Sequence, residues 1–448
     1  MKTNSLLFAA IALAALSGIL YWSNHRKPAE NAVKVSADTP PKILTLVQAD
    51  IAKVDIRKKN GDEVQLAMND AGKWQIMGAK ALRADQNEVS SMLSTLSSLG
   101  SERLIEEKAG NLAEYGLAQP VVEVDVTEKD SKTQKLLIGD NTPAGNAAYA
   151  ALAGDPRVFT LASYSKTSLD KSAKDLRDKR LLVFEQDKLS RVELAAKKQD
   201  IEFGRNKDQW QIVKPKPLRA DDSNVEELIR KLGDAKMDLN ASDEDQKKAA
   251  AAFSSGTAVA TAKVTDASGT EELQVRKSKD DYYAKSTAVD GVYKVSSDLG
   301  TALDKSVDDF RNKKLFDFGF TDPEKIELHA GDKAYFLTKG GSDWFSADGK
   351  KVDAMGAEAL VGKVRDLAAS KFPDSGFGAV EVAVTVSSSG GKSVEKVLIS
   401  KDGDHYVAKR EGETALYQLD PVVVTGLEKA AEDMKPAVEP KPEAKKKK

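Results

Sequence analysis

Cysteine is absent from this sequence, and its absence excludes disulfides, thiolate metal sites, cysteine nucleophiles and a lipid-modified N-terminal cysteine. Histidine is scarce: the sequence has 3, at His25, His329 and His405, and no two have the spacing of zinc ligands. Glycine-rich phosphate loops and the Gly-x-Ser-x-Gly turn of serine hydrolases are also missing. We therefore predict no metal, no cofactor and no catalytic residue.

An excess of charge of one sign is lacking as well. Lys and Arg number 68 and Asp and Glu 70, which gives a formal net charge of -2. Without a basic field nothing attracts a phosphate backbone, so we expect no nucleic-acid partner. The length of 448 residues suits about three domains. With 41% hydrophobic and 31% charged residues, the chain can bury cores and still have a well-solvated surface.

One long uncharged run stands at the N-terminus. The 17 residues from Leu6 to Trp22 would form a helix of ~25 Å, at the short end of what spans a membrane, with Trp22 at the interface. We predict a transmembrane anchor over residues 1–27 and a flexible linker over 28–42. The alternative is a cleaved signal peptide, because residues 15–17 offer a small-x-small cleavage site. The charges on the two sides of the run leave its orientation nearly tied.

Several segments recur at a spacing of about 134 residues, which indicates three copies of one module. Two recurrences share an offset of 136 residues: Trp74-Gln75-Ile76 with Trp210-Gln211-Ile212, and Leu82-Arg83-Ala84-Asp85 with Leu218-Arg219-Ala220-Asp221. Leu176–Leu181 recurs as Phe310–Leu315, and Trp344-Phe345 marks a weaker third copy. We assign the modules to residues 43–186, 187–318 and 319–434. A Lys- and Pro-rich tail, 435–448, is expected to be disordered, either solvated or weakly attracted to anionic lipid.

Each copy has the same order of elements. It opens with short runs of alternating apolar and polar residues, such as Val54-Asp55-Ile56, typical of antiparallel strands with one buried face. A helix follows, and in the first copy its apolar stripe is Val89, Met92, Leu93 and Leu96. More alternating strands and a terminal helix close the copy. The predicted fold class is α+β: an N-terminal transmembrane helix followed by three repeated modules of antiparallel sheet packed with helices.

The recurrent tryptophans and arginines each allow two interpretations. Trp74, Trp210 and Trp344 end alternating strands, so we expect them to pack in the core beneath the following helix; the alternative is ligand stacking. Arg83 and Arg219 are expected to pair with neighbouring carboxylates or to contact a partner protein.

The recurrent aspartates Asp85, Asp221 and Asp353 stand where helices are expected to begin. A carboxylate at that position accepts hydrogen bonds from free backbone N–H groups and opposes the positive end of the helix dipole. We therefore predict capping; the alternative is a set of catalytic carboxylates.

Further motifs accompany the repeats. They are Tyr115-Gly116-Leu117 with Pro120, Leu136-Leu137-Ile138-Gly139-Asp140 with Gly145 and Tyr149, and Leu176-Arg177-Asp178-Lys179. With the Trp-Gln-Ile and Leu-Arg-Ala-Asp motifs they resemble the bacterial domain-of-unknown-function family 4340 over most of residues 45–318. The third copy departs from the pattern, since it has no Ile-Gly-Asp. The resemblance implies a single-pass inner-membrane protein with an extracytoplasmic body, encoded beside ABC-type exporter components, and it implies no catalytic residue.

From the residues and the resemblance we expect a non-catalytic, membrane-anchored envelope protein, an accessory or scaffold of an ABC-type transport system. Its expected location is the bacterial inner membrane, with the body in the periplasm. One alternative is a periplasmic protein that binds lipid, glycan or peptide in a groove between modules. Another is a hydrolase that uses paired carboxylates.

Overall fold

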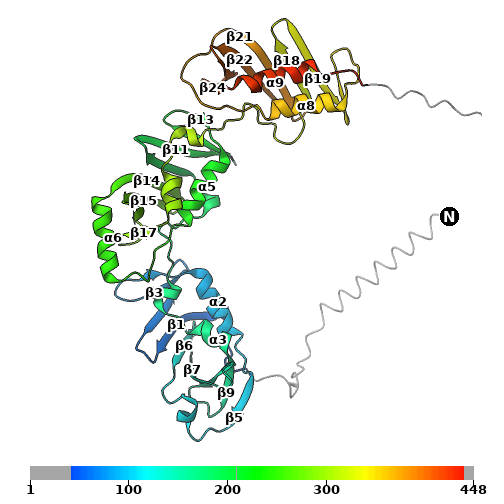
Figure 1. Ribbon diagram of the computed structural model, residues 1–448. Helices are drawn as coiled ribbons and strands as arrows, with labels where there is room; N and C mark the ends of the chain where they lie inside the picture. The colour runs from blue at the N-terminus through cyan, green and yellow to red at the C-terminus, as the bar shows by residue number, and fades with distance from the viewer. Residues whose placement is uncertain (1–41, 208, 438–448) are drawn as a thin grey trace, which may run out of the picture. The chain divides into compact units, whose positions relative to one another are not determined.

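The computed structural model of the chain describes residues 42–207 and 209–437 (Figure 1). These residues form three antiparallel sheets with helices packed against them, which confirms the predicted sheets and the α+β class. The predicted anchor from Leu6 to Trp22 and the predicted tail beyond residue 437 lie outside the described residues. Within the described ranges, no helix is both long and apolar enough to cross a membrane.

Contacts divide the described residues into two compact units, one that ends at Asp178 and one that begins at Lys179. The first unit holds the first sheet, whose nine strands have the order β4-β3-β2-β1-β6-β7-β8-β9-β5. An early and a late meander therefore lie on either side of the central β1–β6 pair. The strands are β1 (Ile51–Lys58), β2 (Glu63–Met68), β3 (Trp74–Met77), β4 (Leu82–Arg83), β5 (Arg103–Glu106), β6 (Val122–Glu128), β7 (Thr133–Asn141), β8 (Ala147–Leu152) and β9 (Val158–Ala162). The helices are η1 (Gln48–Asp50), α2 (Gln86–Ser97), η2 (Leu112–Tyr115), α3 (Ser163–Leu169) and α4 (Ala173–Leu176).

The second unit holds an eight-stranded sheet, β13-β12-β11-β10-β14-β15-β16-β17, with the same arrangement around the β10–β14 pair. Its strands are β10 (Arg191–Ala196), β11 (Gln199–Asn206), β12 (Gln209–Lys214), β13 (Leu218–Arg219), β14 (Thr257–Asp266), β15 (Gly269–Ser278), β16 (Asp281–Ser286) and β17 (Tyr293–Val295). Its helices are η3 (Gln186–Lys188), α5 (Asp222–Gly233), α6 (Asp243–Ser255), α7 (Ser297–Leu303) and η4 (Val307–Phe310).

The second unit also holds the third sheet, with seven strands in the order β20-β19-β18-β21-β22-β23-β24. Its strands are β18 (Lys325–Ala330), β19 (Lys333–Gly340), β20 (Asp343–Phe345), β21 (Val380–Ser388), β22 (Ser393–Asp402), β23 (His405–Arg410) and β24 (Leu416–Leu419). Its helices are α8 (Ala354–Arg365) and α9 (Pro421–Glu432), which lie side by side across one face of the sheet (Figure 1).

Period-two alternation decides which face of each sheet is buried. In β1, Val54 and Ile56 have no exposed surface, and they stand opposite Val126 and Val124 of β6 on the same face. The apolar stripe of α2 covers this face, and its four inward side chains are at most 3% exposed. Removing a leucine-sized side chain from water contributes roughly 1.5–3 kcal/mol, so this stripe is the main force that holds the helix to the sheet.

Each module connects to the rest of the chain at the two ends of its first helix. The incoming segment pairs just after that helix: Ile43 N–H donates to Leu99 O, Leu181 N–H to Ala235 O and Leu315 N–H to Leu367 O. The outgoing segment pairs just before it: Leu176 O accepts from Asp85 N–H, Phe310 O from Asp221 N–H and Lys435 O from Asp353 N–H. Residues 435–437, which we expected to begin the tail, therefore complete the third module.

The sequence pattern did not predict helix α6. Its alanine-rich stretch has no apolar stripe, and Ala249 is the one residue of the helix that is buried. Its N-terminus is capped: Ser242 accepts a hydrogen bond from Asp245 N–H, and three acidic residues occupy the first turn.

Candidate functional site

The three recurrent tryptophans lie in the cores of their modules. Trp74, Trp210 and Trp344 are 7%, 2% and 5% exposed. In the first module the side-chain amide of Gln86 accepts from Trp74 N–H at 2.9 Å and donates to Trp74 O at 3.0 Å. In the second module the Asp222 carboxylate accepts from Trp210 N–H at 2.6 Å. Because Gln86 and Asp222 are the first residues of α2 and α5, these contacts tie the tryptophan strands to the helices that cover them.

The three recurrent aspartates stand at helix starts. Asp85 accepts from Asn87 N–H at 3.0 Å and from Glu88 N–H at 3.3 Å. Asp221 accepts from Asn224 N–H and Asp353 from Gly356 N–H, each at 3.1 Å. Each carboxylate therefore caps the first helix of its own module, and this role explains its recurrence without any reaction.

The recurrent arginines contact carboxylates of the same unit. In the first unit, Arg83 Nε lies 3.9 Å from Asp178 Oδ2. In the second, Arg219 Nη1 donates to Lys314 O at 2.7 Å, and its guanidinium forms ion pairs with Asp317 and with Glu413 of the third module. A contact of Arg83 or Arg219 with another protein stays a prediction.

Arg219 belongs to an ion network where the second module meets the third. At its centre Arg410 reaches Asp317 at 3.0 Å, Glu395 at 2.9 Å and Glu413 at 3.0 Å. The side chains of Arg410 and Glu395 are only 13% and 10% exposed. Burial disfavours the Arg410 cation, but the attraction of Asp317 and Glu413 outweighs it, so the pKa of Arg410 lies above its ordinary value.

A cleft of about 400 Å³ opens beside this network. Second-module residues Gln211 and Lys216–Arg219 line one side, and residues 412–415 of the third module line the other. The lining combines charged, amide and hydroxyl groups with small apolar side chains, a mixture that suits a polar ligand or a protein segment. This junction is the candidate functional site, because it is where residues far apart in sequence converge on one concave surface.

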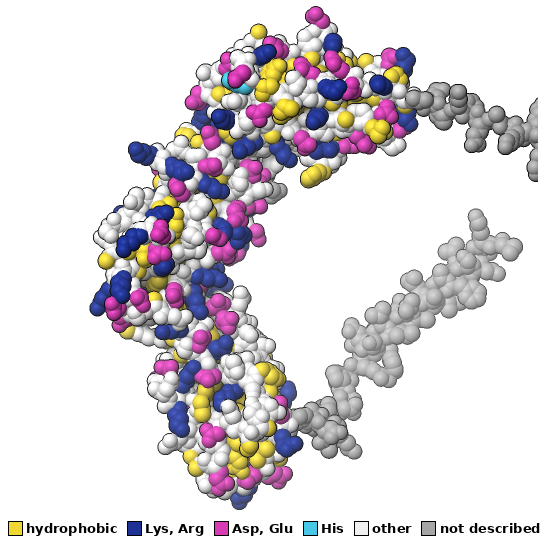
Figure 2. All heavy atoms as spheres, viewed as in Figure 1, with side chains coloured by type: hydrophobic (Ala, Val, Ile, Leu, Met, Phe, Trp, Pro, Cys, Tyr) yellow, Lys and Arg dark blue, Asp and Glu magenta, His cyan; other side chains and the backbone are white. Residues whose placement is uncertain are grey.

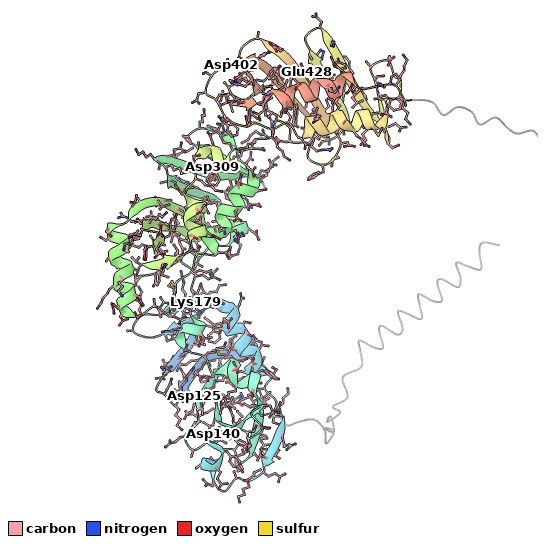
Figure 3. All side chains as sticks on the ribbon, in the orientation of Figure 1. Asp125, Asp140, Lys179, Asp309, Asp402 and Glu428 are labelled. Carbon is pink, nitrogen blue, oxygen red and sulfur yellow. The ribbon has the colours of Figure 1, made fainter. Side chains whose placement is uncertain are left out.

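A second charged cluster, which the sequence reasoning missed, lies on the first sheet, on the face opposite Val54 and Ile56. Asp55 of β1 stands directly opposite Asp125 of β6 (Asp125 is labelled in Figure 3). Lys53 lies 2.7 Å from Asp55, Arg57 lies 2.7 Å from Asp125, and Lys135 lies 3.6 Å from Asp125. These cations offset the repulsion between the carboxylates, so the pair is held as an ion-pair ladder. This cluster could have been found from the sequence, because Lys53, Asp55 and Arg57 alternate with the buried Val54 and Ile56 and must therefore share the other face of the sheet.

The described residues contain no group of three or more histidine, aspartate or glutamate side chains arranged to hold a metal ion. His329 packs edge-on against the Phe336 ring, with 5.7 Å between centroids. His405 Nδ1 lies 3.1 Å from Asp404 Oδ1 at the surface. Packing and surface pairing explain the positions of these two histidines.

The motifs that carry the family resemblance pack against one another at one end of the first sheet. Gly116 ends η2 with φ 68°, and a Cβ there would lie 2.5 Å from Asp140 Cγ (Figure 3). A Cβ on Gly139 would lie 2.1 Å from Tyr115 O. Tyr115 also packs edge-on against Tyr149, with 5.0 Å between ring centroids. Glycine is therefore required at both positions for the loop to close on the sheet.

The third module keeps this contact with different residues. A Cβ on Gly376 would lie 2.3 Å from Asp402 Oδ2, as Gly116 meets Asp140 in the first module. The sequence concealed this equivalence because Ser400 and Lys401 stand between Ile399 and Asp402, where the first copy has only Gly139 between Ile138 and Asp140.

Comparison with protein families gives two matches, which meet at Trp210 in strand β12. The model described as Domain of unknown function (DUF4340) matches residues 74–211 and 210–388. Neither a curated protein nor a solved structure matches the chain. Because the two matches together span residues 74–388, more than half of the 448 residues, the chain belongs to the DUF4340 family.

Proposed function

We propose that the chain is a non-catalytic scaffold of the bacterial envelope and an accessory of an ABC-type transport system. Residues 1–27 anchor it in the inner membrane, and its modules lie in the periplasm. The uncharged run from Leu6 to Trp22 supports the anchor, and the family resemblance supports the link to transport. The non-catalytic role is supported by the recurrent aspartates and tryptophans, which serve capping and packing.

The observation that carries the proposal is the joint between the second and third modules. Phe310 O and Asn312 N–H bond to the second module, at Asp221 N–H and Arg219 O, and three residues later Leu315 N–H bonds to Leu367 O of the third. The connecting segment is thus fixed to both modules, and the Arg219–Arg410 ion network reinforces it. A stiff body built from repeats offers a constant surface for docking, which is the property a scaffold needs.

Ligand binding between modules is the second candidate, and the 400 Å³ cleft favours it. The polar and charged lining suits a glycan or a peptide better than a lipid chain, which would leave Lys216, Arg219 and Glu413 unsolvated beside hydrocarbon.

Photo-crosslinking in the native bacterium tests both candidates. A crosslinking amino acid at Thr414, on the cleft, is compared with one at Asp348 on the same module, followed by purification of the full-length chain from gently solubilised membranes. The scaffold proposal expects ABC-type transport subunits among the adducts from position 414. Recovery of the chain alone, without any envelope protein, would count against a scaffold, and a saccharide or peptide adduct at position 414 would favour the second candidate.

A further inference from the structure

Among the described residues, the gap between the turn that leads into each sheet and the first helix of the module is bridged by side-chain hydrogen bonds in the first and third modules but not in the second. The turn contains Gln48, Gln186 or Phe320, six residues before Val54, Val192 and Ile326. In the first module Gln48 Nε2 reaches back to the helix, 3.5 Å from Ser90 O and 3.5 Å from Ser90 Oγ. The turn and the helix thus meet.

In the third module the same gap is closed by charged groups. Arg365, at the end of α8, donates to Gly319 O at 2.8 Å and to Asp322 at 2.8 Å. Lys339 donates to Asp322 at 2.7 Å and lies over the Trp344 ring, 5.4 Å from its centroid. These contacts join the turn, the hairpin and the helix.

In the second module the gap is a hollow of about 440 Å³ beside α5. Gln186 and Asp187 of the turn, Arg205 and Trp210 of the hairpin, and Glu226 and Arg230 of α5 contribute to its lining. The hollow is separate from the junction cleft, with which it shares no lining residue.

Trp210, one of the lining residues, carries a buried donor without a partner in the described part of the chain. Its side chain is 2% exposed, and its indole Nε1 is buried with no hydrogen-bond acceptor among the described residues. A buried donor without an acceptor is costly, so the site favours any ligand that supplies one. Arg205 covers the ring at 5.2 Å from its centroid and donates to Asp187 O at 3.1 Å, so a ligand that reaches the indole has to displace this side chain.

The charged side chains of the lining are three carboxylates, those of Asp187, Glu226 and Glu227, and two guanidiniums, those of Arg205 and Arg230, which leaves one negative charge in excess. Arg230 is neutralised by Glu227 at 2.7 Å and Asp234 at 2.9 Å. The carboxylates of Asp187 and Glu226, by contrast, have no ion-pair partner among the residues that the structure describes. Figure 2 shows acidic side chains gathered on the second module over α5.

From this geometry we infer that the hollow binds a polypeptide segment that carries a lysine or arginine side chain. The backbone carbonyl of the segment accepts from the Trp210 indole N–H, and its cationic side chain pairs with Glu226 and Asp187. A carboxylate ligand would be repelled by those groups, and a simple cation would leave the indole without an acceptor. The inference stands on the second module alone and does not depend on the anchor or on a transporter.

Fluorine NMR of the full-length chain labelled with 5-fluorotryptophan tests this site, because the sequence has 4 tryptophans and Trp210→Phe identifies the relevant signal. The probe is the capped tripeptide Gly-Lys-Gly, and the control peptide is capped Gly-Glu-Gly. We expect the lysine peptide to shift the Trp210 signal saturably and to leave the Trp344 signal in place. Glu226→Gln should weaken binding about tenfold, because a hydrogen bond to a charged group is lost. The matched control is Glu358→Gln, which changes the exposed residue at the same place on α8 and should leave binding unchanged.

Three results would overturn the inference: no shift at Trp210 at any peptide concentration, equal shifts with the glutamate peptide, or unchanged affinity in Glu226→Gln. Thermal unfolding of Glu226→Gln, an exposed position, shows whether the variant remains folded. Absence of transport subunits from purified membranes would leave this peptide titration unaffected, so the two proposals fail independently.

Discussion

Single carboxylates decide where the first helix of each module begins. Asp85, Asp221 and Asp353 accept backbone N–H groups that would otherwise lack a partner. The sequence predicted these roles correctly because capping depends on residues within three positions of each other. Local rules of this kind are readable from sequence alone.

Replacement of one cap measures this effect. Asp221→Ala should lower the free energy of unfolding by about 1 kcal/mol, because Asn224 N–H loses its acceptor. Asp221→Asn keeps an acceptor oxygen and should lose less. Urea unfolding followed by tryptophan fluorescence compares the two variants, and an equal loss in both would show that capping is not the cause.

Tyr115 provides a second residue-scale test. Its hydroxyl donates to Glu106 at 2.7 Å, and this hydrogen bond, with burial as the second cause, raises the pKa of Tyr115 to about 12. Because the folded pKa lies above the unfolded value of 10.0, the contact contributes stability that is complete below pH 10 and is lost as the pH rises toward 12. The difference in tyrosinate absorbance between wild type and Tyr115→Phe should have its midpoint near pH 12. A midpoint near pH 10 would rule out the hydrogen bond.

At the scale of elements, most strands and the first helix of each module could be predicted because alternation and the apolar stripe are strong signals. Strands β8, β16 and β23, one in the second half of each module, were not predicted. Nor were helix α6 and strand β5. The first has a single buried residue, and β5 (Arg103–Glu106) is a partly exposed edge strand that pairs with β9, more than 50 residues away. An element with few buried residues has only a weak periodic pattern of apolar residues in its sequence.

The turn between β10 and β11 has a backbone conformation that disfavours the two lysines it contains. Lys197 and Lys198 both lie in the left-handed region, with φ 50° and 60°. This conformation costs a lysine about 1 kcal/mol, whereas Asn-Gly adopts it readily. Lys197→Asn with Lys198→Gly should therefore raise the free energy of unfolding by about 1 kcal/mol, measured by urea unfolding. A decrease would mean that the ion pair of Lys197 with Asp304, at 3.8 Å, outweighs the strain.

The capping box of α4 links stability to acidity. The hydroxyl of Ser172 donates to Asp175 at 2.6 Å, and this hydrogen bond lowers the pKa of Asp175 below its ordinary value of 3.8. The sign follows from a depressed folded pKa: the contribution is complete well above pH 3.8 and is lost as the pH falls through the folded pKa. Acid unfolding of Ser172→Ala should begin at a higher pH than that of wild type. Superimposable acid transitions would contradict this role.

At the scale of the whole molecule, the contacts at the junction of the second and third modules could not be predicted from the sequence. Arg219 was expected to meet either a nearby carboxylate or a partner, and its partners are Asp317 and Glu413, 98 and 194 residues further along the chain. No local rule links such distant positions. The role of Arg410 was not predicted for the same reason.

Removal of the central arginine tests the stiffness of this junction. Arg410→Met leaves the nearly buried Glu395 without its cation and should cost roughly 3 kcal/mol. The segment around residues 310–318 should then be cleaved faster in limited proteolysis of the full chain. Lys350→Met, an exposed pair with Asp348 on the same module, serves as control and should change neither stability nor cleavage. Unchanged cleavage in Arg410→Met would show that the ion network does not stiffen the junction.

The outgoing contacts at Leu176 and Phe310 are equivalent, and this has a consequence for the gene. Recombination that joins Arg177 directly to Asn312 would delete 134 codons and create the sequence Leu-Arg-Asn-Lys-Lys-Leu, every residue of which already serves at a connection of this kind. Copy number can therefore change by whole steps while the backbone hydrogen bonds at each connection are kept. Natural variants that are longer or shorter by about one such step are the expected trace of that history.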